Sequence, residues 1–346
     1  MSVEQRLETP TTMISNKTPT TVKIRQHFSF KPLPVIEDAS DNDEPPKDPL
    51  QELLKQTWDI HGVSPLFQFN YQSERHLKLY GKKLREEIAS LLPKDDMKYS
   101  VKFEVDANID PRPNATDPPA IKIQVFAENI EKETQKCLYT GILVSWGSSL
   151  VELDNENTVK LPLLLCRGNK TAIRAVHMTL ARMFDCVIIQ LLATEEDLRW
   201  LAPIILNFND NEKDTKGLMK FEYKIPGLAS SDDISFSWEI SVLIKLWTAI
   251  CENDMNDSFN GNDFTLPHVD RFYQILHKQI LQDAGLQIGF SKLCKISLPY
   301  ITIAENRMKA STSQVLNKVL LFFNEKATEL LHLLNCDVSR NSNISN

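Results

Sequence analysis

The sequence predicts an α+β fold with a mainly antiparallel, curved sheet, helices packed against that sheet, and a long C-terminal helix. Two observations support this prediction. Segments that resemble strands come in groups and do not alternate strictly with helices, which argues against a doubly wound parallel sheet. Near the C-terminus, apolar residues with helical spacing continue for about five turns, which is long for a helix in a globular protein.

Length and composition are those of an ordinary globular protein. The chain has 346 residues, with 39 basic and 46 acidic side chains and a formal net charge of −7. The first ten residues contain no apolar signal region, and no run reaches the roughly 18 apolar residues of a membrane span. We therefore expect a protein that is neither secreted nor membrane-spanning. The six cysteines lie far apart, which favours reduced thiols over a disulfide framework.

The N-terminal 49 residues differ in composition from the rest of the chain. They hold seven of the 18 prolines, few large apolar residues and an acidic run. Such a segment cannot bury enough apolar surface to fold by itself. We expect residues 1–49 to be a disordered acidic, proline-rich tail and residues 337–346 to be a disordered C-terminal tail. Residues 50–336 are expected to form one α+β domain. A division of this domain into two lobes near 190–215 is the alternative.

Periodicity predicts the elements of the first half of the domain. Apolar spacing at one helical turn marks helices, the second of which stops before Pro93, and alternation of apolar and polar residues marks half-buried strands. The expected elements are helices at 50–58 and 77–91, strands at 101–105, 121–125 and 138–146, and a hairpin partner for the last strand at 150–153.

The second half is read by the same rules. Thr194 is a suitable N-cap, and Glu195, Glu196 and Asp197 would occupy the first helical turn, where the helix dipole favours anions. The expected elements are helices at 171–184 and from 195 onward, strands at 219–225 and 234–238, helices at 240–247 and 269–280, strands at 286–303 and 308–313, and a helix at 315–334.

The sequence contains no pattern typical of an enzyme or a cofactor site. No glycine-rich phosphate loop occurs, and no closely spaced pair of cysteines or histidines is present, so a zinc site would have to be assembled entirely from distant residues. His177 lies beside an apolar helix face, where a hydrogen-bonded core or boundary histidine is favoured over a catalytic one. Cys186 is best explained as a small buried hydrophobe. We predict no catalytic residue, no metal and no cofactor.

Charge is distributed unevenly along the chain. Residues 160–184 contain five basic and no acidic side chains, and residues 278–326 contain seven basic and three acidic ones. By contrast, residues 193–270 contain six basic and fifteen acidic ones. The molecule is therefore expected to have a basic face and an acidic face. A basic face is suited to a phosphate backbone, and a solvated surface mosaic is the alternative.

Several short segments, read together, resemble the centromere protein L family of the inner kinetochore. The segment from Trp58 to Tyr71, with Ser64-Pro65-Leu66-Phe67 in it, resembles that family's W…TPLYxFSY opening. Further matches follow in the same order along the chain. These matches are Thr140-Gly141, Ser148-Ser149-Leu150, Leu161–Leu165, Phe184-Asp185-Cys186, Trp200-Leu201-Ala202 and Asp233-Ile234-Ser235-Phe236. The acidic stretch Cys251–Asp263 finds no counterpart in the family. The collinear resemblance spans roughly residues 50–334.

The resemblance implies a non-enzymatic adaptor subunit in the nucleus, at the centromere and kinetochore, that acts in chromosome segregation. It implies a heterodimer with centromere protein N through edge-strand and C-terminal contacts, and other inner-kinetochore subunits as neighbours. The assembled complex would line a basic passage for DNA and join the nucleosome that carries the centromeric histone H3 variant. No membrane and no small-molecule substrate are implied.

Two sets of candidate site residues follow. In the strand 293–298, Cys294, Ile296 and Leu298 are expected on one side, and Leu293, Lys295 and Ser297 on the other. Lys170 and Arg174 lie one helical turn apart and share a face. The DNA-backbone candidates are Lys292, Lys295, Lys309, Arg167, Lys170 and Arg174. The partner-interface candidates are Ile296, Leu298, Ile301, Ile303, Met308, Phe322 and Phe323.

Three questions stay open at this point. The strand pair within 293–313 is either an exposed edge or an interior hairpin. The alternative functions are a freestanding DNA clamp without sequence preference, against which the overall acidity argues, and an enzyme of unrecognised type, for which no site is found. Alternation of side chains does not distinguish a strand that faces a partner from a core strand.

Overall fold

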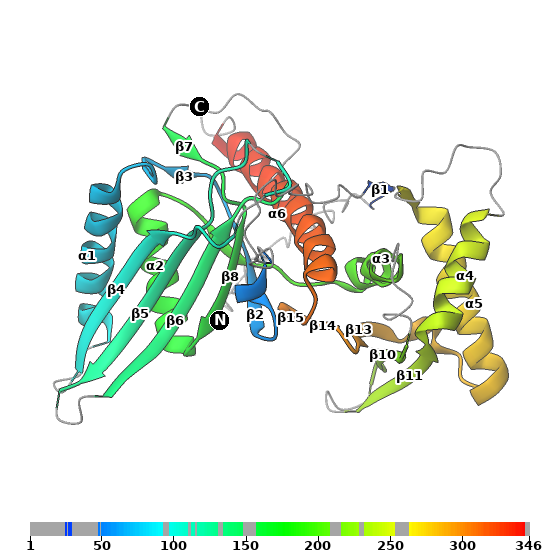
Figure 1. Cartoon of the computed structure of the whole chain (residues 1–346). Coiled ribbons are helices and arrows are strands. Elements are labelled where there is room, and N and C mark those ends of the chain that lie inside the picture. Colours follow the sequence, from blue (N-terminus) through cyan, green and yellow to red (C-terminus); the bar gives the residue numbers. More distant parts are fainter. Residues whose placement is uncertain are drawn as a thin grey trace, which may run out of the picture.

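The structure is a computed structural model of the chain, drawn in Figure 1. It describes residues 25, 27–29, 48, 50–92, 97–109, 112–114, 116–130, 134–147, 157–207, 216–227, 232–252 and 263–342. Within these ranges, the α-helices are α1 (Glu74–Leu91), α2 (Lys170–Phe184), α3 (Glu195–Leu206), α4 (Ile240–Glu252), α5 (Leu266–Ala284) and α6 (Ser313–Ser342). Short 3₁₀ helices occupy η1 (Gln51–Leu53) and η3 (Ile288–Phe290).

Most of the described strands join one large sheet. They are β1 (His27–Ser29), β2 (Thr57–Val63), β3 (Leu66–Phe67), β4 (Met97–Val105), β5 (Ile121–Asn129), β6 (Thr134–Val144), β7 (Thr158–Val159), β8 (Leu163–Gly168), β9 (Ile188–Gln190), β10 (Leu218–Lys224), β11 (Asp233–Glu239), β12 (Asp263–Thr265), β13 (Lys292–Leu298), β14 (Ile301–Ala304) and β15 (Arg307–Ala310). The large sheet is 11-stranded, in the order β11-β10-β13-β14-β15-β2-β8-β6-β5-β4, with β9 also paired to β2. Every described pairing in it is antiparallel, as the sequence predicts.

Helices cover the two halves of the sheet from opposite sides. In Figure 1 the sheet runs from β4 on the left to β11 on the right, with α1 and α2 on the left, α3, α4 and α5 on the right, and α6 between them. Leu163 and Leu165 of β8 belong to a core built with α3 to α6, here called the α6 core. Leu164 and Cys166 of the same strand belong to a core built with α1 and α2, here called the α2 core. Because adjacent residues of a strand point to opposite faces, the two cores lie on opposite faces of the sheet.

Local signals explain several element ends. The side chain of Asn169 accepts a hydrogen bond from the Thr171 backbone N–H at the start of α2. That helix ends at Asp185, which has a left-handed backbone with φ of 44°. Thr194 and Asp197 form a reciprocal capping box at the start of α3, which confirms the predicted helix start.

One predicted element is wrong. Leu50, Leu53 and Trp58 do not share a helix, because the chain forms only η1 and then enters β2. The indole N–H of Trp58 donates a hydrogen bond to the Leu53 carbonyl at 2.9 Å, so the chain folds back between these residues. In β2 the buried residues Trp58 and Ile60 alternate with more exposed ones, which is the strand pattern.

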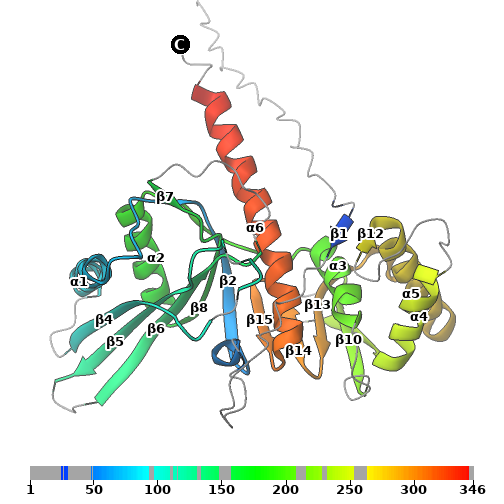
Figure 2. The same ribbon diagram turned by 45° about the horizontal axis from the view of Figure 1, so that its top comes forward.

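Other predicted boundaries shift or cannot be compared. The segment predicted as one strand region from 286 begins with η3, and β13 starts at Lys292. The predicted hairpin partner at 150–153 lies outside the described residues; the described partners of β6 are β5 and β8. Figure 2 shows that α6 projects beyond the other elements, and its backbone continues to Ser342, past residue 336.

A short part of the N-terminal 49 residues lies against the folded body. β1 pairs with β12, and Phe28 is buried against Phe322 with ring centroids 5.6 Å apart. The Arg25 guanidinium lies 4.4 Å from the centre of the Phe322 ring and 2.9 Å from a carboxylate oxygen of Glu325. The expectation of a disordered tail does not hold for Arg25 and β1, and nearly all of the other tail residues lie outside the described part of the chain.

Candidate nucleic-acid interface

The face of the sheet opposite the α6 core is polar and basic over β10, β13, β14 and β15. We call it the open face, since no described helix packs on these four strands from that side. Alternation along the strands and the pairing register identify its side chains. They are Lys220, Glu222, Lys224, Lys292, Lys295, Ser297, Thr302, Ala304, Arg307 and Lys309.

The register arranges these side chains in rows across the strands. One row runs from Lys220 through Ser297 and Thr302 to Lys309. Ser297 and Thr302, in the middle of the row, have shorter side chains than the two lysines at its ends. Strands β13, β14 and β15 together carry four cationic side chains and no acidic one, which is the charge bias that a phosphate backbone requires.

Two acids from neighbouring strands partly neutralise this strip. Glu222 lies 3.0 Å from Lys295 and 3.0 Å from Lys220, and Asp59 of β2 lies 2.9 Å from Arg307. Burial alone would raise the pKa of Glu222, but hydrogen bonds and charge from Lys295 and Lys220 outweigh burial and lower the pKa below its usual range. Glu222 is therefore ionised at neutral pH.

Lys292 and Lys309 differ from the paired lysines. Both are exposed, and neither forms an ion pair with another described residue. A phosphate group that approached them would not have to displace a carboxylate. Among the predicted DNA-backbone candidates on β13 and β15, these two differ from Lys295, which pairs with Glu222.

A β-bulge corrects one detail of the sequence analysis. The register between β10 and β13 shifts at Glu222/Tyr223, so that Leu293 faces the α6 core together with Ile296 and Leu298. Strict alternation would place Leu293 on the open face. Lys295 nevertheless lies on the open face, as predicted.

The second predicted basic group is divided between the two sides of the sheet. The Arg167 guanidinium lies 5.3 Å from the centre of the Trp58 ring, and Trp58 belongs to the α6 core. Lys170 and Arg174 are exposed on α2, which packs on the other side of the sheet, the side of the open face. The structure therefore places Lys170 and Arg174 on the same side of the sheet as the open face, and Arg167 on the opposite side.

All seven predicted partner-interface residues lie in the chain's own core. Each is at most 6% exposed. Their strands occupy the interior of the sheet, which agrees with the alternative of an interior hairpin. A partner cannot contact their side chains unless the chain rearranges. They are Ile296, Leu298, Ile301, Ile303, Met308, Phe322 and Phe323.

The free edges of the large sheet lie elsewhere. Among the described strands, β11 forms one edge and β4 the other. On β11, Ile234, Phe236 and Trp238 are half-buried, because no further strand shields them. An edge strand with apolar side chains is suited to pairing with another chain.

Three further cations of the open face were not predicted. Lys220 and Lys224 alternate with buried Met219, Phe221 and Tyr223 in β10, and this alternation is visible in the sequence. Arg307 begins β15 and shares a row with Lys295 through Ala304. Only the strand order, which the sequence does not reveal, brings β10 next to β13.

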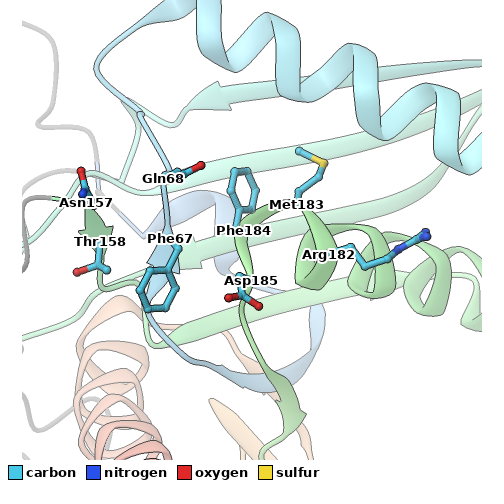
Figure 3. A pocket seen from close by; sticks show the side chains of 8 residues that line it. All are labelled: Phe67, Gln68, Asn157, Thr158, Arg182, Met183, Phe184 and Asp185. Carbon is cyan, nitrogen blue, oxygen red and sulfur yellow. The ribbon is translucent and has the colours of Figure 1, made fainter.

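A surface pocket of about 700 Å³ lies away from the open face. Figure 3 shows it between the β3–β7 pair and the C-terminal end of α2. Its charged lining residues are Arg182, which binds Glu87 of α1 at 2.9 Å, and Asp185. None of the eight described residues that line it is a histidine, cysteine or lysine.

Cys186 and His177, the two side chains considered for catalysis in the sequence, lie in environments typical of structural residues. Cys186 is buried, and burial, with the nearby Asp185 charge, raises the pKa of its thiol to about 11, so it is not a thiolate nucleophile. His177 is half-buried beside Tyr139, as predicted for a boundary histidine, and it lies near His61 and Cys166. The five cysteines with described side chains are free thiols.

No helix in the described part of the chain combines the length and apolar character that crossing a bilayer requires.

Comparisons with known proteins agree with the resemblance found in the sequence. The family model for centromere protein L matches residues 52–335. Centromere protein L of Gallus gallus is 24% identical over 299 residues, which cover 84% of this chain and 83% of that protein. Centromere protein L of Xenopus tropicalis is 24% identical over 288 residues, with 80% and 79% covered. The chain therefore belongs to the centromere protein L family, whose members are non-enzymatic structural proteins of the inner kinetochore, at the centromere in the nucleus.

Proposed function

We propose that the chain is an adaptor subunit that pairs with a centromere protein N-like subunit, contacts other inner-kinetochore subunits and presents its open face to the DNA backbone of the centromeric nucleosome. The observation that carries the DNA part is the strip formed by β13, β14 and β15, which has four cationic side chains and no acidic one. Membership of the centromere protein L family supports the adaptor part.

The chemistry of the open face favours contact with phosphates. Lysine ammonium groups act as point charges toward phosphate oxygens, and such contacts position DNA without reading its bases. Thr302 and Ser297 add hydroxyl groups between the lysines, which can donate to the same oxygens. Binding should therefore depend strongly on salt and little on DNA sequence.

The edge strand β11 is our proposed site for the partner. A strand added there would continue the sheet and complete the cover over Ile234, Phe236 and Trp238. Since β11 neighbours β10, the added strand would also lengthen the open face beside Lys220 and Lys224. This arrangement would let the two subunits form one continuous basic surface.

The test measures DNA binding by the heterodimer, produced by co-expression with a centromere protein N-like subunit and isolated by size exclusion. Fluorescence anisotropy with a labelled duplex gives the affinity over a range of salt concentrations. Lys292→Glu combined with Lys309→Glu should weaken binding and reduce the slope of log K against log salt by about 2, since each lost phosphate contact removes about 0.9. Lys295 is left unchanged, because a glutamate there would face Glu222.

The matched control is Lys82→Glu combined with Lys83→Glu. These exposed lysines lie on α1, which packs on β4, at the far end of the strand order from β13, and the pair changes the net charge by the same amount. The control should leave the salt slope unchanged. An equal slope in wild type and in the Lys292/Lys309 variant would overturn the DNA proposal. Failure to recover any companion subunit, or equally tight DNA binding by the chain alone, would favour the freestanding clamp.

A further inference from the structure

Three potential metal ligands from distant parts of the sequence meet beside the middle of the sheet. They are His61 on β2, Cys166 on β8 and His177 on α2, and one ligand atom of each lies within 4.8 Å of the other two. Asp59 pairs with Cys166 across the two strands, so Cys166 and His61 point to the same face of the sheet. Helix α2 packs on that face and brings His177 over the strands.

The distance between Cys166 and His61 suits a tetrahedral ion. The sulfur of Cys166 lies 3.6 Å from Nδ1 of His61. Bonds of about 2.0 Å from zinc to nitrogen and about 2.3 Å from zinc to sulfur, at a tetrahedral angle, place these two atoms about 3.5 Å apart. The two imidazole rings are nearly perpendicular, at 79°, with centroids 4.7 Å apart, so they do not stack against each other.

Each imidazole also has a partner outside the cluster. Nε2 of His177 lies 3.4 Å from the Tyr139 hydroxyl, and His61 forms a hydrogen bond with the backbone of Asp59. Hydrogen bonds of this kind hold the orientation of an imidazole ring. Gly141 makes room for the tyrosine, because a Cβ at that position would overlap the Tyr139 ring.

The cluster lies at the boundary of the α2 core, where β2 and β8 meet α2. His61 and His177 are only half-buried, so an ion can reach the cluster although Cys166 itself is enclosed.

We propose that His61, Cys166 and His177 bind one Zn²⁺ ion, with a water molecule as the fourth ligand. Two nitrogens and one thiolate are donors that zinc prefers, and the bound ion displaces the proton of the thiol. The ion would tie β2 and β8 to α2, at the point where the α2 core meets the open face. This inference does not depend on the proposed contact with DNA.

The first test measures the metal content of the full chain, purified in its heterodimer, loaded with zinc and passed through gel filtration. We expect about one zinc per chain in the wild type by mass spectrometry of the metal, and under about a tenth of that in Cys166→Ser and His177→Gln. Cys186→Ser and His277→Gln are the matched controls. Both alter a buried or half-buried residue outside the cluster and should retain the ion.

The second test uses Co²⁺ in the wild type and so does not depend on any variant folding. Tetrahedral cobalt with a thiolate ligand should give a thiolate-to-cobalt charge-transfer band in the near ultraviolet and intense d–d bands in the visible. Zinc should also raise the melting temperature of the wild type, while Mg²⁺ should not. Substoichiometric zinc in the wild type, or a cobalt spectrum without the thiolate band, would show that the cluster is only a hydrogen-bonded group of neutral side chains.

Discussion

At the scale of single residues, Lys318 is a cation held inside the protein. It lies on α6, is 9% exposed, and donates hydrogen bonds to the carbonyls of Ile204 and Asn207 at the end of α3. The last carbonyls of a helix lack partners within the helix, and the negative end of its dipole favours a cation. Burial nevertheless lowers the pKa of Lys318 to about 8.

This pKa predicts a particular dependence of stability on pH. The pKa of lysine in the unfolded chain is near its model value of 10.5, so between the folded and unfolded values the unfolded state binds more protons. Over that window, the contribution of Lys318 to the free energy of unfolding should increase with pH. From about pH 7.5 to 9.5, wild type should gain about 2 kcal/mol relative to Lys318→Met.

Urea unfolding of the two proteins at a series of pH values measures this difference. Lys83→Met, which removes an exposed ammonium group from α1, controls for the loss of one positive charge. A free-energy difference between wild type and Lys318→Met that stays constant over the window would show that Lys318 is not held in a desolvated site.

At the scale of elements, the start of α3 joins this helix to α6. The Thr194 side chain accepts a hydrogen bond from the Asp197 backbone N–H at 3.3 Å, and the Asp197 carboxylate accepts one from the Thr194 backbone N–H at 2.7 Å. The same carboxylate forms an ion pair with Lys326 of α6. One capping box therefore fixes both the first turn of α3 and its attachment to the neighbouring helix.

Removing the capping hydroxyl should destabilise the protein modestly. Thr194→Ala leaves a backbone N–H of the first turn without its acceptor and should cost about 1 kcal/mol of the free energy of unfolding, while Thr194→Ser should retain most of it. Urea denaturation of the three proteins measures the effect. Equal losses in the alanine and serine variants would mean that the threonine methyl group, not the hydroxyl, provides the stabilisation.

Elements with strong local signals could be predicted from the sequence. Thr194 and the acids after it mark the start of α3, and the apolar spacing of Leu77, Leu84 and Ile88 marks α1. The prediction of a helix over Leu50 to Trp58 is wrong because its four apolar residues at helical spacing also fit a 3₁₀ turn followed by a strand. Only the contact of Trp58 with the Leu53 carbonyl, a tertiary feature, distinguishes the two.

The candidate site could be predicted only in part. Alternation places Lys295 on the polar side of its strand, but the burial of Ile296 and Met308 depends on which helices cover the sheet. The grouping of His61, Cys166 and His177 depends on the order of β2 and β8 and on the position of α2. Such groupings have no signal in local spacing, so only the fold reveals them.

At the scale of the whole molecule, the two cores share a backbone. Every residue of the α2 core lies before position 190, whereas the α6 core draws residues from both ends of the chain. Strands β2, β6 and β8 contribute side chains to both cores, since successive residues point to opposite faces. Unfolding of either core would remove hydrogen-bond partners from strands that the other core needs. We therefore expect the two cores to unfold together.

The distribution of tryptophan provides a way to test this coupling. All five tryptophans, Trp58, Trp146, Trp200, Trp238 and Trp247, lie in or against the α6 core. The α2 core contains tyrosine and phenylalanine but no tryptophan among its described residues. Tryptophan fluorescence therefore reports on the α6 core, while far-ultraviolet circular dichroism reports on the whole chain.

Leu164 and Leu165 form a matched pair for this experiment, because they are neighbours on β8, both fully buried, and face opposite cores. Replacing either by alanine should cost about 2 to 5 kcal/mol of the free energy of unfolding. If the cores are coupled, Leu164→Ala should shift the fluorescence transition of the α6 core as far as the circular dichroism transition, although the new cavity lies in the core whose described residues include no tryptophan. A fluorescence midpoint that stays at the wild-type value in Leu164→Ala, while Leu165→Ala lowers it, would instead show two independently unfolding lobes.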